Sequence, residues 1–170
     1  MRIRRARAAD IPEIHALIAH YAGEGILLPR NEDDIRRHLG GFLVLADRDA
    51  MVGCVALEIY HPALAEVRSL AVNPAKIGRG LGARLVKSAL ELADRRRISR
   101  VFALTSSPEF FLRQGFEIST RHSLHEKIDR DCIHCPKART CLLSAVIADL
   151  GPASAIFNIL DEASEPVPVE

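Results

Sequence analysis

The sequence lacks an excess of charge of either sign, with 23 lysines and arginines against 22 aspartates and glutamates. Without a strongly positive field, neither nucleic acid nor an anionic membrane is favoured as a partner, so any anion must be recognised locally. Long apolar runs are also missing. No stretch of about 18 uninterrupted apolar residues occurs, and the basic start MRIRRARAADIP has no apolar segment of a secretory signal. We therefore expect a cytoplasmic protein.

The 170-residue length suits one domain rather than two, since a chain of this size hides roughly two thirds of its unfolded surface. Internal repeats are absent. From about residue 151 the composition shifts to small, acidic and proline residues. We expect a single domain over residues 1–150 and a tail over residues 151–170. Apolar residues of the tail could dock on the body or on a second subunit of a homodimer.

Apolar spacing predicts alternating strands and helices. We expect helices over residues 10–23, with Asp10 as cap, from 31 or 32 to 39, from 81 to the basic cluster at 95–97, and over 108–113. The expected strands cover residues 1–7, 42–46, 51–60, 66–72, 101–105 and 116–119. Turn-like residues separate the second, third and fourth of these strands, which favours an antiparallel meander within a mixed α/β fold.

A glycine-rich segment, Gly78-Arg79-Gly80-Leu81-Gly82, lies between a predicted strand and a predicted helix. Here successive backbone N–H groups and the positive helix end can point into one concavity that fits a phosphate or pyrophosphate. A Cβ atom would block that close approach. A Walker loop is excluded because Gly-Lys-Ser/Thr is missing, and a dinucleotide fingerprint fits poorly. A plain turn remains the alternative.

The segment from Ile77 to Gly82 resembles the acyl-CoA motif Q/R-x-x-G-x-G/A of the GCN5-related N-acetyltransferase (GNAT) family, with Ile77 where Gln or Arg is expected. SLAVNP before it and PEFFLRQGF after the fifth strand extend the resemblance over about residues 1–120. The resemblance implies a GNAT-type fold, a mostly antiparallel sheet flanked by helices, that uses acetyl-CoA. The implied cofactor-binding residues are Leu70, Ala71 and Val72 beside the pantetheine, and Ile77, Gly78, Arg79, Gly80, Leu81, Gly82 and Ala83 around the pyrophosphate.

Four further strings, EGILLPR, AEVRSLAV, VFALTSSPEFF and DCIHCPKARTC, are similar to the short N-acetylglutamate synthases. This resemblance implies acetylation of the α-amino group of L-glutamate, the first step of arginine biosynthesis. A small acceptor with two carboxylates needs at least two cationic groups and a base. The implied cations are Arg30 and Lys127, together with Arg68, which shares a strand face with the implied base Glu66.

Each of these assignments has a structural alternative. Arg30 could be a solvated arginine paired with the following helix, Lys127 an ordinary exposed lysine, and Glu66 a strand-edge partner of Arg68. Many relatives carry a tyrosine that protonates the leaving thiolate, but Phe111 stands at that position. Ser106 resembles the hydroxyl that serves this role in the synthases, with Thr105 and Ser107 as rivals and a turn-forming serine as the alternative.

Cys132 and Cys135 have zinc-type spacing, and Cys141 could add a third ligand, with His122, His125 or Cys54 as the fourth. A second Cys-x-x-Cys pair is missing, so packed or redox-sensitive thiols are favoured and no metal ligand is assigned. Two functional alternatives stay open. One is acetylation of another amine: glutamine, another amino acid, a protein N-terminus or an aminoglycoside. The other is a non-catalytic acyl-CoA sensor.

Overall fold

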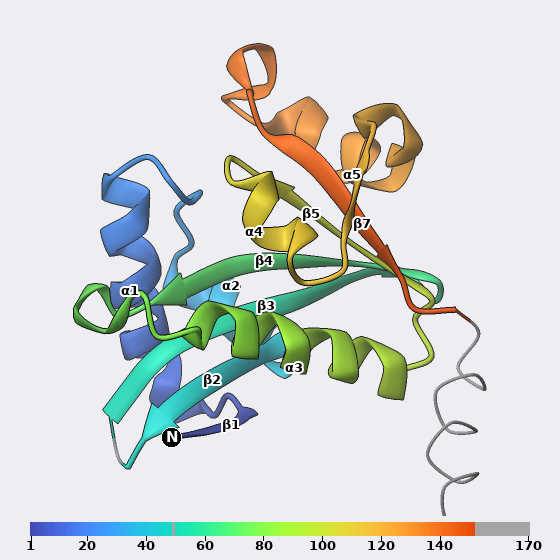
Figure 1. The fold of residues 1–170 in the computed structure, drawn as a ribbon. Coiled ribbons are helices and arrows are strands. Elements are labelled where there is room, and N and C mark those ends of the chain that lie inside the picture. The colour runs from blue at the N-terminus through green and yellow to red at the C-terminus, as the bar shows by residue number, and fades with distance from the viewer. Residues whose placement is uncertain (49, 152–170) are drawn as a thin grey trace, which may run out of the picture.

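One mixed sheet organises the computed structural model, which describes residues 1–48 and 50–151 (Figure 1). The strand order is β1-β2-β3-β4-β5-β7-β6, and every neighbouring pair is antiparallel except β4 with β5. The predicted antiparallel meander and mixed fold class are thus confirmed. The tail predicted over residues 151–170 lies, from residue 152 on, outside the described residues. The strands are β1 (Arg2–Arg5), β2 (Phe42–Asp47), β3 (Ala50–His61), β4 (Leu64–Val72), β5 (Arg100–Thr105), β6 (Glu117–Ser119) and β7 (Ser144–Asp149).

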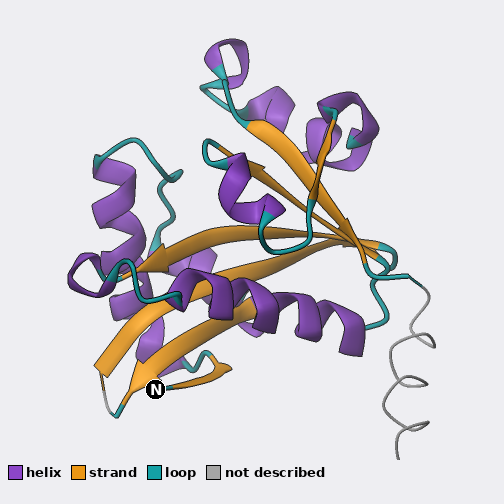
Figure 2. Cartoon of the chain, viewed as in Figure 1, coloured by secondary structure: helices purple, strands orange, loops and turns teal. Residues whose placement is uncertain are grey.

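Helices cover both faces of the sheet (Figure 2). They are α1 (Ile11–Gly23), α2 (Glu32–Arg37), α3 (Leu81–Arg95), α4 (Pro108–Leu112) and α5 (His125–Arg130). Asn31 caps α2 by accepting a hydrogen bond from the Asp34 amide at 2.8 Å. Asp10 is the N-cap residue of α1, as predicted, but its carboxylate makes no capping bond to this helix and accepts from Arg4 and from the Arg7 amide instead. Among the described residues, no helix is both long and apolar enough to span a membrane.

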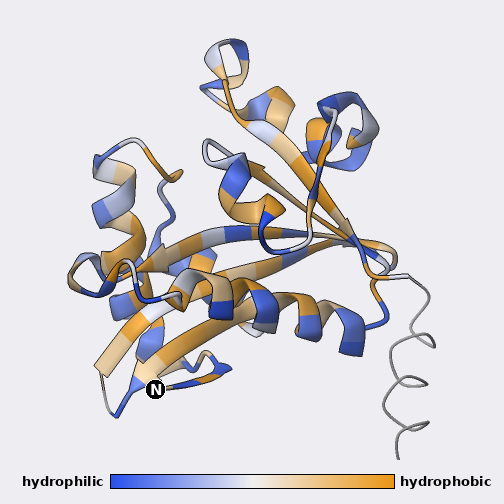
Figure 3. Ribbon diagram, viewed as in Figure 1, coloured by the Kyte–Doolittle hydropathy of each residue, from blue (hydrophilic) through white to orange (hydrophobic). Residues whose placement is uncertain are grey.

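The two faces of β4 are covered by different helices. Ala65 and Val67 pack into the core that α3 covers with a stripe that includes Leu85 and Leu92. In Figure 3, apolar and polar residues alternate along α3, as expected for a helix with one face on the core. Because strand side chains alternate, Glu66 and Arg68 project from the opposite face, where α1 and α2 pack. Glu66, the predicted base, therefore lies on the side of the sheet that α1 and α2 cover.

Two irregularities open the sheet beside these residues. The β3–β4 register shifts between the pairs Cys54–Ala71 and Ala56–Arg68, so β4 carries an extra residue at this point. Ser69 adopts a φ of 52° in this bulge, a left-handed conformation that is unfavourable for a side chain other than glycine. The β4–β5 pairing ends at Glu66, opposite Phe102, after which the two strands spread apart (Figure 1).

Candidate functional site

The glycine segment leaves a row of amide groups without acceptors. In the described chain, the amides of residues 78 to 83 donate no hydrogen bond to a backbone or side-chain acceptor, whereas the Arg84 amide donates to Gly80. Gly78 and Gly80 have φ values of 82° and 69°, which directs these amides away from ordinary helical pairing. The amides precede and begin α3, whose positive end adds to their attraction for an anion.

The contact surface around these amides is open. A Cβ atom added at Gly78 or Gly80 would meet no heavy atom within 4 Å, so the need for glycine comes from the positive φ. Gly82 is different, because an added Cβ would lie 3.4 Å from the Phe110 ring. The Ile77 side chain is 63% exposed and has no polar group to offer an anion. Ile77 therefore adds no side-chain donor to the backbone amides of this segment.

The free edge of β4 beyond Glu66 holds the backbone groups predicted to face pantetheine. No strand pairs with residues 67–72 on the β5 side within the described chain, so this edge can accept an added strand. One acceptor on it is already occupied, since the Tyr21 hydroxyl donates to the Val72 carbonyl at 2.6 Å. Leu70 and Ala71 lie directly after the bulge, where an amide could polarise a thioester oxygen.

Glu66 is 4% exposed and is held by two donors. Its Oε2 accepts hydrogen bonds from the Lys127 ammonium and from the Tyr60 hydroxyl, both at 2.9 Å. Arg68 is farther away, with its Nη1 3.9 Å from the same oxygen. Lys127 and Tyr60 therefore satisfy the Glu66 carboxylate, and a simple salt bridge with Arg68 does not. The structure brings the predicted base together with two of the predicted cations.

Asp131 completes this cluster from the residue after α5. Its Oδ2 accepts from the Tyr60 hydroxyl at 2.6 Å, from Lys127 at 2.8 Å and from Arg68 at 3.4 Å. Burial alone would raise the pKa of Asp131, but the hydrogen bonds from Lys127 and Tyr60 outweigh burial and lower the pKa far below its ordinary value. Asp131 is therefore charged in the resting cluster, while Lys127 bridges two carboxylates.

Arg30 is close to this cluster but is more enclosed than expected. Its side chain is 6% exposed, and its Nε donates to the Asp34 carboxylate in an i, i+4 pair. Its Nη1 also approaches the Ser69 hydroxyl at 3.4 Å, and the guanidinium lies 5.2 Å from the centroid of the Phe42 ring. The i, i+4 pair with Asp34 is thus present, whereas the side chain is buried and not solvated; the role of Arg30 in binding a substrate carboxylate stays a prediction. Arg30 supports the β4 bulge.

A polar cleft of about 350 Å³ lies over these residues. Elements far apart in the sequence form its walls: the segment before α2, α2 itself, β3, β4 and the end of α5. Charged and polar side chains dominate the lining, which comprises Arg30, Asp34, His38, Glu58, Arg68, Arg130 and Asp131. Arg130 donates to Glu58 at 3.3 Å and His38 Nε2 lies 3.6 Å from the same carboxylate, so Glu58 connects the α2 and α5 sides of the cleft.

Several of these residues escaped the sequence analysis. The sequence analysis assigned no role to Tyr60, Asp34, Glu58, Arg130 or Asp131. Their spacing carries no motif because they come from separate elements. The one available signal was that Asp131 follows Lys127 by four residues, which places both on one side of a helix.

The predicted acid is less well defined. Ser106 lies exposed in the bend after β5, while the Thr105 hydroxyl accepts a hydrogen bond from the Ser107 amide at 2.9 Å. Phe111 is buried and packs edge-to-face with Phe110 and Phe116, so it is a core residue. The assignment of Ser106 stays a prediction.

The cysteines are divided between two environments. Cys54 is buried on the α1 side of the sheet, and its thiol donates to the Ser69 carbonyl at 3.6 Å. Burial raises the pKa of the Cys54 thiol to about 12, so it stays protonated there. Cys132, Cys135 and Cys141 are partly exposed. Over residues 1–48 and 50–151, no group of three or more His, Cys, Asp or Glu side chains could hold a metal ion.

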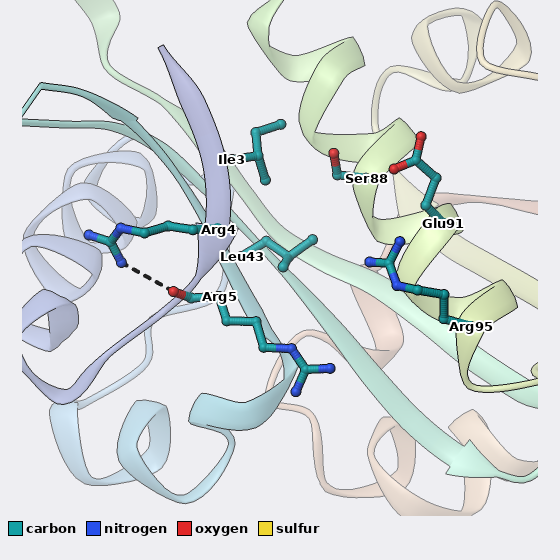
Figure 4. A pocket seen from close by; sticks show the side chains of 7 residues that line it. All are labelled: Ile3, Arg4, Arg5, Leu43, Ser88, Glu91 and Arg95. Atoms are coloured by element: carbon teal, nitrogen blue, oxygen red, sulfur yellow. Dashed lines mark hydrogen bonds between the residues drawn. The ribbon is translucent and has the colours of Figure 1, made fainter.

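A smaller hollow of about 180 Å³ lies between β1 and α3 (Figure 4). Ser88, Glu91 and Arg95 project into it from α3, while Arg4 points away to donate to the Arg5 carbonyl at 3.1 Å. None of the predicted site residues lines it. The candidate site is therefore the larger cleft together with the open wedge between β4 and β5.

Comparisons with known proteins identify the family of this chain. The model of the acetyltransferase (GNAT) family matches residues 9–116. An uncharacterised N-acetyltransferase of Chlorobaculum tepidum is 36% identical over 148 residues, covering 87% of this chain and 96% of its own. An amino-acid acetyltransferase of Mycobacterium tuberculosis is 39% identical over 134 residues, covering 76% of each chain. The N-acetylglutamate synthase of Neisseria gonorrhoeae, solved with coenzyme A and N-acetyl-glutamate, superposes with a TM-score of 0.77 at 29% identity. The match covers 88% of this chain and 35% of that longer one.

Proposed function

Because the chain belongs to the GNAT family and is an acetyl-CoA-dependent N-acetyltransferase, we propose that its acceptor is the α-amino group of L-glutamate. The observation that carries the proposal is the position of Glu66. This carboxylate lies where β4 and β5 separate, beside a cleft that contains three guanidinium groups. The N. gonorrhoeae structure supports the choice, since that protein was solved with N-acetyl-glutamate.

In this proposal acetyl-CoA lies along the wedge. The amides of residues 78 to 83 bind its pyrophosphate, and the β4 edge at Leu70 and Ala71 holds the pantetheine and the thioester oxygen. Glu66 removes a proton from the acceptor ammonium, because the amine must be neutral before it attacks. Attack forms the N–C bond directly, and collapse of the tetrahedral intermediate breaks the C–S bond with no acyl-enzyme.

The cations of the cleft orient the acceptor. Arg68 is the best placed of them, since it lines the cleft two residues after Glu66 on the same face. Arg130 also lines the cleft, and Lys127 donates to Glu66 beside it. Arg30 contributes by holding the bulge at Ser69 and by presenting its remaining N–H groups to the cleft. A substrate carboxylate would compete with Asp131 for Arg68.

One observation favours a second acceptor. The three guanidinium groups of the lining are matched by three carboxylates, those of Asp34, Glu58 and Asp131. A cleft whose formal charges balance in this way suits an amino acid with a neutral side chain, and glutamine has the length of glutamate with an amide at its end. Glutamine is therefore the second candidate acceptor.

The test measures release of the CoA thiol from acetyl-CoA with a panel of L-amino acids that includes glutamate, glutamine and aspartate. We expect glutamate to give the highest kcat/KM. Glu66→Gln should lower kcat at least about a hundredfold, and Arg68→Ala should raise the KM for glutamate about tenfold. Arg113→Ala, which removes an exposed guanidinium outside the cleft, is the control. Equal turnover of every amino acid, or an active Glu66→Gln variant, would contradict the proposal.

A further inference from the structure

We propose that Tyr60 passes the proton that Glu66 takes from the acceptor amine on to Asp131 at the wall of the cleft. This inference rests on the proposed function, in which Glu66 is the base. Tyr60 acts through Glu66 and is therefore a positioning residue of the reaction. The relay comprises three groups from three elements: Tyr60 on β3, Glu66 on β4, and Asp131 after α5.

The geometry of the Tyr60 hydroxyl carries the proposal. Its oxygen lies 2.9 Å from Glu66 Oε2 and 2.6 Å from Asp131 Oδ2. A phenol has one proton, so it donates to one carboxylate at a time. Both carboxylate oxygens lie within hydrogen-bonding distance of the hydroxyl, so it can donate to one carboxylate and accept from the other when that one is protonated. With a proton on Glu66, its O–H donates to Tyr60 and the Tyr60 O–H donates to Asp131. The hydroxyl can thus connect the two carboxylates once Glu66 has taken a proton.

The chemistry requires such an exit. Acetyl transfer from a thioester to an ammonium group removes two protons from nitrogen while one N–C bond forms and one C–S bond breaks. One proton ends on the CoA thiolate, and the other must reach solvent before the next turnover. Glu66 is 4% exposed and lies beneath the cleft, whereas the Asp131 side chain is 28% exposed and lines it. Tyr60 connects the enclosed group with the open one.

The charges around Tyr60 keep it neutral while it does so. Glu58 on β3 and Arg68 on β4 are close by, and α5 contributes Lys127 and Arg130. Burial of Tyr60 and the negative charge of Glu66 raise the pKa of the phenol well above its ordinary value. A phenolate therefore does not accumulate, and the hydroxyl gains one proton as it gives up the other.

Packing fixes the direction of the hydroxyl. The Arg130 guanidinium lies 3.6 Å from the centroid of the Tyr60 ring, and the ring of Phe102 is 5.5 Å away on the sheet. A guanidinium over an aromatic face is attractive, more so when partly desolvated. Lys127 bridges the same two carboxylate oxygens from the other side, at 2.9 Å and 2.8 Å, and holds them within reach of one hydroxyl.

Steady-state kinetics of the purified full-length protein test the relay. Tyr60→Phe keeps the ring but removes the hydroxyl, and Asp131→Asn keeps the shape but removes the proton acceptor. We expect each variant to lower kcat about tenfold, with little change in the KM for acetyl-CoA. Because both lie on one path, the double variant should also lose about tenfold and not a hundredfold. A small diffusible buffer acid–base such as imidazole should restore part of the kcat of Tyr60→Phe.

Glu126→Gln is the matched control, because its carboxylate lies on α5 and pairs with His61 at 3.0 Å, outside the cluster. Thermal unfolding of each variant identifies loss of folding. An unchanged kcat in Tyr60→Phe, multiplicative losses in the double variant, or no rescue by imidazole would overturn the relay. These results are distinct from failure of the proposed function, which would appear as no turnover of any amino acid by the unaltered protein, or as full activity of Glu66→Gln.

Discussion

The Lys127 ammonium lies 2.9 Å from Oε2 of Glu66, although 61 residues separate the two in the sequence. Both side chains are more than nine-tenths buried, and the same ammonium lies 2.8 Å from Asp131. Lys127 therefore links the α5 segment to β4. It compensates the charge of the predicted base while leaving Glu66 next to the cleft.

Because of this link, we expect Lys127→Met to lower the stability of the fold strongly. The substitution leaves two carboxylates close together without their shared cation, and loss of one partner of a buried ion pair costs about 3 to 5 kcal/mol. We expect the free energy of unfolding in urea to fall by about 3 kcal/mol. Lys87→Met removes an exposed lysine on α3 and should have little effect. Equal stability of the two variants would show that the buried pair contributes nothing.

The Arg4–Asp10 pair predicts how stability depends on pH. Two hydrogen bonds of 2.7 and 2.8 Å from Arg4 lower the pKa of Asp10 below its ordinary value of 3.8. The charged carboxylate therefore stabilises the fold above about pH 4, and this contribution is lost as the pH falls through the folded-state pKa. Asp10→Asn should lower the free energy of unfolding at pH 7 by about 1 to 2 kcal/mol.

Urea unfolding between pH 7 and pH 2.5 measures this dependence. The difference between Asp10→Asn and the unaltered protein should shrink as the pH falls below about 4. Glu117→Gln, at an exposed position on β6 with no ion pair in the described chain, serves as the comparison. A difference that stays constant across the whole range would mean that the ion pair does not account for it.

Substitution of Gly80 should separate the effect of backbone strain on stability from its effect on the KM for acetyl-CoA. With its φ of 69°, Gly80→Ala places a side chain in the left-handed region at a cost of about 1 to 2 kcal/mol. If the segment relaxes to avoid this strain, its amides turn away, and the KM for acetyl-CoA should rise about tenfold. Gly115 has a φ of 86° and is equally free of neighbours, so Gly115→Ala should cost similar stability at unchanged KM. Similar KM values in both variants would argue against the amide cradle.

A substitution at Ile77 should strengthen the binding of acetyl-CoA. The residue is exposed and stands where the family motif expects Gln or Arg, so Ile77→Arg adds a cation beside the proposed pyrophosphate site. The KM for acetyl-CoA should fall about threefold to tenfold at low salt and return toward the original value as salt screens the contact. Ile118→Arg, at 62% exposure on β6, is the matched control. An unchanged KM in Ile77→Arg would place the diphosphate elsewhere.

Local patterns predicted most of the fold as far as residue 119. Helices α1 and α3 have apolar stripes of helical period, and strands β2 to β4 are separated by turn-forming residues, so neighbours in the sequence contain the necessary information. Strand β7 was missed. Its sequence SAVIAD is short, rich in alanine and buried on both faces, so it shows no alternation. Its partners β5 and β6 define it by hydrogen bonds that no local pattern reveals.

The sequence by itself determined the glycine segment, because positive φ values and exposed amides depend on residue type within a few positions. It also indicated Glu66 and Arg68 on one face, since strand alternation is local. Only the tertiary structure decided that Tyr60, Lys127 and Asp131 surround Glu66. Charged side chains in a cleft interact through space over a few ångströms, and the chain segments that bring them together are separated by up to 71 residues. Apart from the four-residue spacing of Lys127 and Asp131, the sequence spacing therefore carries no record of that cluster.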